Sequence, residues 1–242
     1  MAQAHLKRTG TVQSHSQRLR QKIDLVRPRL RAATGEAWNH PRLAQLYPEL
    51  VFATHSIIRA TNPSMKAAAE CARARAAGDP VSCALAEYLE HHAEEEKGHD
   101  EWALDDLEVL GVSREDVWQR IPSPTVAALV GSQYYWMHHF HPVAYVSYIA
   151  VLEAPPNADF LEETVRRTGL PREAFSTQFY HSKLDHHHVR EFDKMVDSLP
   201  LNEWHHSILG VNAFHTAEML SRVFDDVVER FEMEHPALES AS

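Results

Sequence analysis

Proline and glycine in this sequence stand where helices begin and end. Asp79-Pro80 and Ser123-Pro124 each place a capping side chain before a proline that suits the first helical position. Three glycines stand where helices would stop, namely Gly78, Gly111 and Gly169. No stretch of the sequence shows the sustained alternation of apolar and polar residues that is typical of a β-strand. We therefore predict a single all-α domain.

These capping residues, prolines and glycines divide the chain into expected helices over residues 14–32, 41–61, 64–77, 80–110, 114–120, 124–154, 158–168, 171–198 and 202–234. Pro142 falls inside the sixth of these helices and is expected to kink it, because proline cannot donate a backbone hydrogen bond. Residues 1–13 are expected to form a mobile, mildly basic tail, and residues 14–242 the helical domain.

Composition excludes several classes of function. The 242 residues carry a net charge of −10, whereas a nucleic-acid-binding surface needs a basic footprint. The N-terminal segment lacks the apolar core of a signal peptide, and the apolar stretches are too short to span a membrane. The two cysteines, Cys71 and Cys83, form no disulfide framework. We expect a cytoplasmic protein that binds neither nucleic acid nor membrane.

Histidine is over-represented, with 18 residues, and the stretch FYHSKLDHHHVREF (179–192) shows where some of it is used. His181, Asp185 and His188 lie four and then three residues apart, so a helix places them on one face. That face continues into Phe192, a residue typical of a core. Three metal-capable side chains on a buried face favour a metal site over a surface cluster.

Two further expected helices carry polar groups on faces that should be buried. In residues 84–111, His92, Glu96 and His99 fill the same stripe as the apolar residues, and Glu96-x-x-His99 is the pair that helical di-iron proteins use. Glu95 lies on the flank of this face, so either Glu95 or Glu96 is a candidate ligand. Glu153 closes an otherwise apolar run, where a carboxylate is costly unless a cation meets it. A charged, solvated surface remains the alternative for each segment taken alone.

Together the three segments offer carboxylates and imidazoles without thiolate, a set that suits iron or manganese better than a structural zinc ion. Six such ligands suit two metal ions. The predicted metal ligands are Glu96, His99, Glu153, His181, Asp185 and His188, and Glu95 and His92 are predicted as further ligands or as their hydrogen-bond partners.

These segments resemble the heme-oxygenase-like di-iron oxidases, a group of iron-containing redox enzymes. The resemblance runs from HPRLAQLYPEL (40–50) to the last helix and is sharpest in YLEHHAEEEKGHDEWALDDLEVLG, HPVAYVSYIAVLE and HSKLDHHH. It implies a fold of about seven main helices like that of heme oxygenase, without heme and often dimeric. It also implies two Fe²⁺ ions per chain that activate O2, held by the six residues above.

The resemblance leaves the reaction open among oxidative C–C or C–H cleavage and N-oxygenation of a small organic substrate. An external electron donor, either a small reductant or a reductase, is compatible with this chemistry, and a homodimer is expected. Polar residues in the last helix and in the segment before Glu153 are predicted to contact substrate, namely Asn212, His215 and Tyr148.

The sequence offers three alternatives, of which we reject the first. A ferritin-like di-iron protein would use Glu203-x-x-His206 or Glu232-x-x-His235, but it leaves the ligands at 181–188 unexplained. A metal-free enzyme of the same fold, of the thiaminase or quinone-cofactor-synthesis kind, would need an activated cysteine or would not need the carboxylates. A non-enzymatic module would use the metal as a structural staple.

Overall fold

The computed structural model describes residues 13–153 and 157–236, and for residues 184–188 it describes the backbone alone. Over this part of the chain there are ten α-helices, one 3-10 turn (η1) and no strand. The helices are α1 (His15–Trp38), α2 (Leu43–Arg75), α3 (Pro80–Glu95), α4 (His99–Val109), α5 (Arg114–Gln119), α6 (Pro124–His139), α7 (Ala144–Leu152), α8 (Ala158–Thr168), α9 (Ser176–Ser198) and α10 (Glu203–Glu234), and η1 spans Arg172–Phe175. The prediction of one all-α domain is confirmed, whereas the predicted tail falls on residues 1–12, outside the described part.

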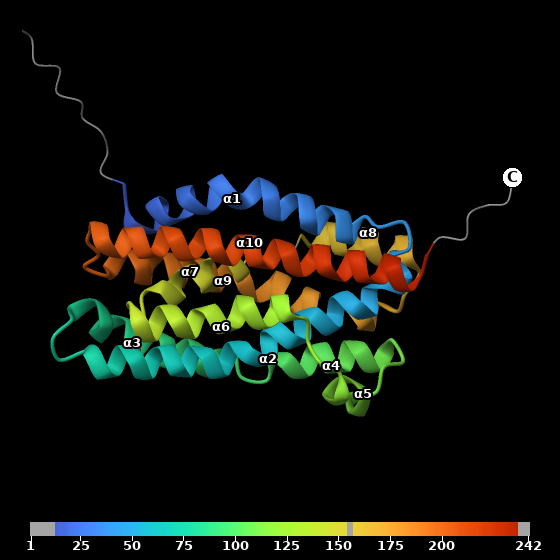
Figure 1. Cartoon of the computed structure of the whole chain (residues 1–242), viewed down its shortest axis with the longest axis horizontal. Coiled ribbons are helices and arrows are strands. Elements are labelled where there is room, and N and C mark those ends of the chain that lie inside the picture. Colours follow the sequence, from blue (N-terminus) through green and yellow to red (C-terminus); the bar gives the residue numbers. More distant parts are fainter. Residues whose placement is uncertain (1–12, 154–156, 237–242) are drawn as a thin grey trace, which may run out of the picture.

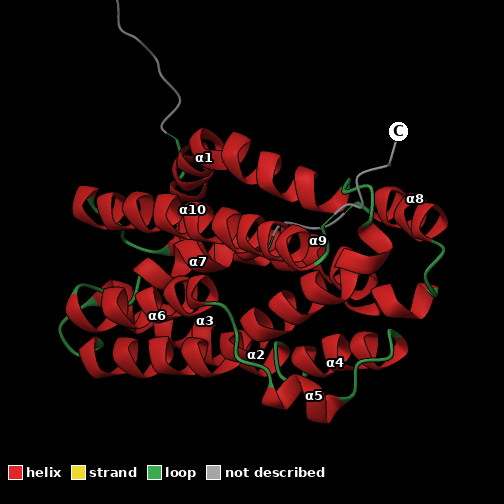
Figure 2. Ribbon diagram, turned by 45° about the vertical axis from the view of Figure 1, so that its right-hand side comes forward, coloured by secondary structure: helices red, strands yellow, loops and turns green. Residues whose placement is uncertain are grey.

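Two long helices, α1 and α10, run side by side along one side of the molecule (Figure 1). Helix α2 lies on the other side and packs against α3, α4 and α6. The short helix α7 lies against α10 and α6, inside the bundle (Figure 2). Helix α9 contacts α4 and α1, so that α2, α3, α4, α7 and α9 surround a common interior.

The expected helix starts at Asp79-Pro80 and Ser123-Pro124 are confirmed. The Asp79 carboxylate accepts hydrogen bonds from the backbone N–H groups of Val81 and Ser82. The Ser123 hydroxyl accepts one from the N–H of Val126 at 3.3 Å. Each cap satisfies donors that the first helical turn leaves without an intrahelical partner.

The single helix expected over residues 80–110 is wrong, because the chain breaks between Glu96 and His99. Gly98 has φ = +86°, a left-handed conformation that glycine adopts without steric cost. Helix α3 therefore ends at Glu95, and α4 begins at His99. The Glu-x-x-His pair spans this break and does not lie on one continuous helix.

Helix α1 runs to Trp38, past the expected end at residue 32, and α9 starts at Ser176 after η1, where a helix was expected from residue 171. Two further differences lie at prolines. Pro142 ends a helix instead of kinking it: α6 stops at His139, and α7 starts at Ala144 after a turn in which Nδ1 of His141 accepts from the N–H of Val143. Pro63 does the opposite, since α2 continues through it and joins the two helices expected over 41–61 and 64–77. Ser64 and Met65, the two residues after Pro63, are both buried.

None of the described helices is both long enough and apolar enough to cross a membrane.

Candidate metal centre

The buried apolar face of α3 continues into His92, the first of the candidate ligands along the chain. Leu85 and Leu89 are fully buried, and His92, three residues further on, continues the same face. The His92 side chain is 3% exposed, so its imidazole is held in the interior among core residues. A polar ring at such a position needs partners for both of its nitrogens.

Two carboxylates supply partners for His92. Its Nε2 lies 2.6 Å from Oε1 of Glu153, the residue that follows the last turn of α7. Its Nδ1 lies 3.1 Å from Oε2 of Glu95, one turn along α3. Glu95 is half-buried and lies at the edge, whereas Glu153 reaches inward from the opposite helix. Glu95 therefore orients the imidazole that faces Glu153.

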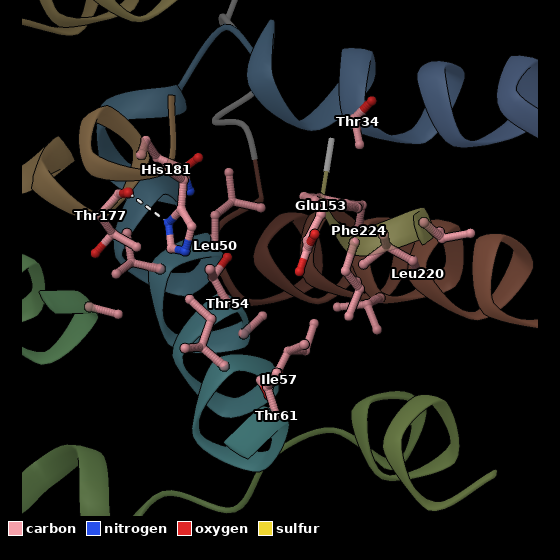
Figure 3. Close-up of a pocket in the computed structure, with 18 of the residues that line it drawn as sticks. Thr34, Leu50, Thr54, Ile57, Thr61, Glu153, Thr177, His181, Leu220 and Phe224 are labelled. Atoms are coloured by element: carbon pink, nitrogen blue, oxygen red, sulfur yellow. Dashed lines mark hydrogen bonds between the residues drawn. The ribbon is translucent and has the colours of Figure 1, made fainter. Parts of the chain in front are cut away.

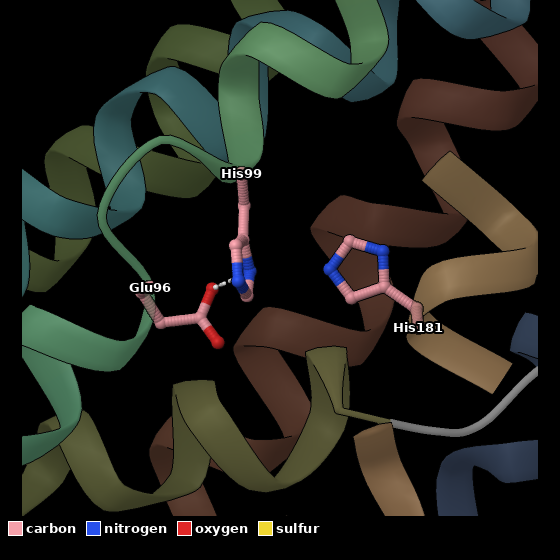
Figure 4. A group of neighbouring side chains, drawn as sticks. All are labelled: Glu96, His99 and His181. Carbon is pink, nitrogen blue, oxygen red and sulfur yellow. Dashed lines mark ion pairs between the residues drawn. The ribbon is translucent and has the colours of Figure 1, made fainter. Parts of the chain in front are cut away.

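Glu96 and His99 come together across the helix break, as Figure 4 shows. Nδ1 of His99 lies 3.0 Å from Oε2 of Glu96, and their side chains are 7% and 11% exposed. The two atoms are close enough for an ion pair, but their geometry is not that of a hydrogen bond. This buried nitrogen of His99 makes no hydrogen bond with any described residue. A buried polar atom without a partner is costly, and a cation between the ring and the carboxylate would satisfy both groups.

His181 reaches the same place from α9. Its Nδ1–H donates to the carbonyl oxygen of Thr177 at 2.8 Å, which leaves Nε2 as the nitrogen that carries a lone pair. The first turn of α9 is itself fixed by Asp106 of α4, whose two carboxylate oxygens accept from the N–H groups of Ser176 and Thr177, each at 3.0 Å. The backbone that holds His181 is thus anchored to α4.

These side chains form two groups that share one residue. Glu96, His99 and His181 form the first, and His92, Glu96 and Glu153 form the second; within each group the ligand atoms lie within 4.8 Å of one another. Glu96 therefore lies between two sets of donors and has two oxygens to offer. Oxygen and imidazole donors without thiolate fit iron, as the sequence predicts.

The remaining predicted ligands, Asp185 and His188, lie one and two turns beyond His181 on α9, but their side chains fall outside the described residues. Their role as ligands stays a prediction. The geometry favours Glu96 over Glu95 as the candidate ligand: Glu96 belongs to both groups, and Glu95 contacts His92 and His91 at their edge.

Electrostatics in the two groups follows from burial and from neighbouring charge. Burial by itself lowers the pKa of His92, but the hydrogen bond to Glu153 and its negative charge oppose this and raise the pKa to about 9. Burial raises the pKa of Glu96, but the adjacent His99, with smaller contributions from His92 and His181, more than offsets this, so the net shift of the pKa is downward. Burial lowers the pKa of His181, which keeps that ring neutral and able to bind a cation.

Aromatic rings cover both groups, a feature that the sequence analysis did not anticipate. Trp102 stacks on His99 with ring centroids 4.0 Å apart, and Tyr88 stacks on His92 at 5.3 Å. Tyr88 precedes His92 by one helical turn, and Trp102 follows His99 by three residues, so helical spacing was the available signal. The rings restrict access of water to the imidazoles.

An apolar cavity of about 290 Å³ opens onto these groups, as the close-up in Figure 3 shows. Glu96, Glu153 and His181 form part of its wall. The rest of the lining is mainly aliphatic and aromatic; most of it comes from α1, α2, α7 and α10, and α4 and α9 add Ala103, Asp106, Thr177 and Gln178. The structure thus places a small apolar chamber beside the candidate ligands, as expected for a ligand site.

Of the three residues predicted to contact substrate, Tyr148 lines this cavity, whereas Asn212 and His215 are not among its described lining residues. The amide of Asn212 donates to Oε1 of Gln133 and to the carbonyl of Ala144, so it joins α10 to α6 and α7. A contact of Asn212 and His215 with substrate therefore stays a prediction that this cavity does not support. The face that lines the cavity carries Leu220, Val223, Phe224 and Val227. Asn212 and His215 were predicted to contact substrate because they are polar residues on an otherwise apolar helix face. Buried polar residues can instead form hydrogen bonds that join packed helices.

Comparisons with known proteins agree with this architecture. Residues 72–209 match a family described as iron-containing redox enzyme. No curated protein matches the sequence. The structure is similar to that of a domain of unknown function with a heme oxygenase-like fold from Shewanella denitrificans OS217, with a TM-score of 0.77, 19% identity and coverage of 93% of this chain and 96% of that one.

Two further solved structures share the fold. A TenA homolog from Pseudomonas syringae pv. tomato str. DC3000 has a TM-score of 0.63 and 11% identity over 93% of this chain and all of that one (100%). A TenA homologue from P. horikoshii OT3 has a TM-score of 0.53 and 13% identity over 86% of this chain and 98% of that one. The predicted heme-oxygenase-like fold is confirmed, and at these identities the likeness concerns the fold alone.

Proposed function

Because the chain belongs to the iron-containing redox enzyme family, we propose that it is a non-heme di-iron enzyme that uses O2 to oxidise a small organic substrate. The observation that carries the proposal is the pair of donor groups that share Glu96 and face one apolar cavity. Two Fe²⁺ ions bound there would supply the redox chemistry with O2. Asp185 and His188 are proposed to complete the ligand set.

The chain's own residues prepare the site for this task. The carbonyl of Thr177 fixes the tautomer of His181, and Glu95 orients His92 from outside the two groups. Each interaction turns a ring nitrogen toward a carboxylate before any cation binds. The metal-free pair of His92 and Glu153 holds a proton that a cation would replace, since imidazole binds metal in its neutral form. The stacked ring of Trp102 and the apolar cavity wall exclude water from the reacting substrate.

The position of the cysteines favours this function over a thiaminase-type reaction on the same fold. Such a reaction needs a nucleophilic thiol beside a carboxylate within the substrate pocket. Neither Cys71 nor Cys83 is among the described residues that line the cavity. Cys71 instead lies 3.4 Å from Nδ1 of His138 near the surface, and burial raises the pKa of its thiol.

The test is an anaerobic titration of the metal-free protein with Fe²⁺, followed by exposure to O2 under optical and Mössbauer spectroscopy. We expect two irons per chain and an oxygen-dependent spectral change. His181→Ala should lose the second iron and the spectral change. The matched control His215→Ala removes a half-buried helical histidine outside both groups and should behave as the wild type. Binding of one iron or fewer by the wild type, or unchanged binding by His181→Ala, would refute the proposal.

A further inference from the structure

The two donor groups lie behind apolar side chains, so a cation from solvent has to reach them through the protein. Tyr88 and Trp102 stack on His92 and His99, and the cavity beside the groups has a mainly aliphatic and aromatic lining. Burial of a cation without donor atoms around it is very costly, so a divalent ion does not cross a wall of this kind. A route into the centre therefore needs oxygen or nitrogen donors that replace the ion's water molecules in turn.

The last turn of α3 carries such donors. Residues three and four apart are neighbours on a helix, so Glu95 faces the rings of both His92 and His91. Nε2 of His91 lies 3.5 Å from Oε1 of Glu95, and Oε2 of the same carboxylate lies 3.1 Å from Nδ1 of His92. The other ring nitrogen of His92 lies 2.6 Å from Oε1 of Glu153. Imidazole and carboxylate thus alternate in a continuous series of four side chains.

Exposure to solvent falls steeply along this series. The side chain of His91 is 72% exposed, that of Glu95 is 31% exposed, and that of His92 is 3% exposed. Glu153, at the inner end, belongs to the donor group that also contains Glu96. The series therefore begins in water and ends at the candidate metal ligands.

Neighbouring carboxylates on α3 are paired with cationic side chains, whereas the contacts of Glu95 are to imidazoles. A carboxylate oxygen of Glu94 lies 3.7 Å from Nζ of Lys66, and the other lies 4.0 Å from Nζ of Lys97. Glu90 pairs with Arg73 in the same way. An ammonium or guanidinium group competes with a metal ion for a carboxylate, but a neutral imidazole binds the ion together with it. The surroundings of Glu95 are therefore suited to a metal ion.

We propose that His91 and Glu95 form an entry site, which takes a divalent cation from solvent and passes it to His92, Glu96 and Glu153. Neither residue belongs to the two donor groups, so both stay outside the filled centre. The inference rests on the proposed function, because it takes the two groups as the place where metal binds. Entry and release cross the same barrier, so loss of the entry site slows both by one factor and leaves the affinity unchanged. Loss of a permanent ligand weakens the affinity instead.

The test is stopped-flow loading of the metal-free protein with cobalt(II) at a fixed pH, followed through the absorption bands of the bound ion. His91→Ala should slow loading about tenfold, the lower end of what local concentration of an ion contributes to an association rate. Release of cobalt to an excess of chelator should slow by the same factor. The cobalt stoichiometry and dissociation constant should stay those of the wild type.

Two glutamate variants separate an entry site from a general attraction of cations. Glu95→Gln should slow loading at least as much as His91→Ala, because it removes the carboxylate between the two rings. Glu94→Gln is the matched control, since it removes the same charge one residue away from a side chain that contacts Lys66 and Lys97. It should load at the wild-type rate.

A wild-type loading rate in His91→Ala, or equal slowing by Glu94→Gln and Glu95→Gln, would overturn the entry site. Weaker cobalt binding by His91→Ala with faster release would also overturn it, since a permanent ligand behaves in that way. Unchanged loading rates in all variants with normal iron stoichiometry would leave the di-iron proposal standing. Failure of the wild type to bind metal would refute the di-iron proposal and this inference with it.

Discussion

Replacement of Gly98 by alanine tests whether the helix break positions two of the candidate ligands. Gly98 has φ = +86°, and a Cβ added there meets no atom within 4 Å, so the cost of alanine is backbone strain alone. A left-handed conformation costs a residue other than glycine about 1–2 kcal/mol. We expect Gly98→Ala to lower the free energy of unfolding by about this amount in urea denaturation followed by circular dichroism.

The strain should also weaken metal binding. In the metal-free Gly98→Ala variant, the turn at residue 98 is expected to relieve its strain by shifting Glu96 relative to His99. A cation bound by Glu96 and His99 would oppose that shift. The affinity for cobalt(II), measured by its absorption bands, should therefore fall by up to the same free energy, which corresponds to about five- to thirtyfold.

Gly111→Ala is the matched control for this experiment. Gly111 has φ = +82° with equally open surroundings, and α4 separates it from the site by about 16 Å. It should lose the same stability and keep normal cobalt affinity. Gly131→Ala, within α6, should stabilise by about 1 kcal/mol, because alanine favours helix. Equal cobalt affinities in the Gly98 and Gly111 variants would refute the reasoning.

Four further substitutions test the shared carboxylate, a buried acid and the core. Glu96→Gln should abolish binding of both irons, whereas Glu153→Gln should remove one, as measured by iron stoichiometry; equal losses would contradict the sharing of Glu96. Burial raises the pKa of Asp106 to about 7, above its value in the unfolded chain, so its contribution to stability is full below about pH 4 and is lost as pH rises through 7. Wild type should therefore lose stability relative to Asp106→Asn over this window in urea denaturation, and a constant difference would argue against the shift. Leu107→Ala, at a fully buried position, should cost about 2–5 kcal/mol by the same assay, and a loss below 1 kcal/mol would show that the site collapses around the deletion.

Local chemistry in the sequence was enough to predict the fold class and most helix starts. Asp79 and Ser123 act through neighbours two or three residues away, so their effect is visible in the sequence. Whether a helix continues through a proline or ends before it was not predictable in this way. Pro63 and Pro142 lack the same backbone donor, yet α2 continues through Pro63 whereas the helix before Pro142 ends at His139. The residues that follow either proline are buried, so neither the local sequence nor burial separates the two cases.

In the candidate site, too, features set by local spacing were predictable and features set by tertiary packing were not. Spacing on α3 and α9 was enough to propose Glu96, His99 and His181, and the structure brings these side chains together. The shared role of Glu96 depends on how α7 meets α3, which is tertiary packing and has no local signal. The positions of α10 that line the cavity were not predicted for a related reason. Asn212 is polar because it joins helices, and the cavity-lining positions of α10 are ordinary apolar residues.

Helix α4 has a consequence for motion in the centre. His99 is its first residue. Asp106 of the same helix accepts hydrogen bonds from the first turn of α9, the helix that carries His181. We therefore expect a small displacement of α4 to move both imidazoles together. Glu96 lies on the other side of the Gly98 turn and does not share this link. Its distance to the two rings is expected to vary more than the distance between the rings.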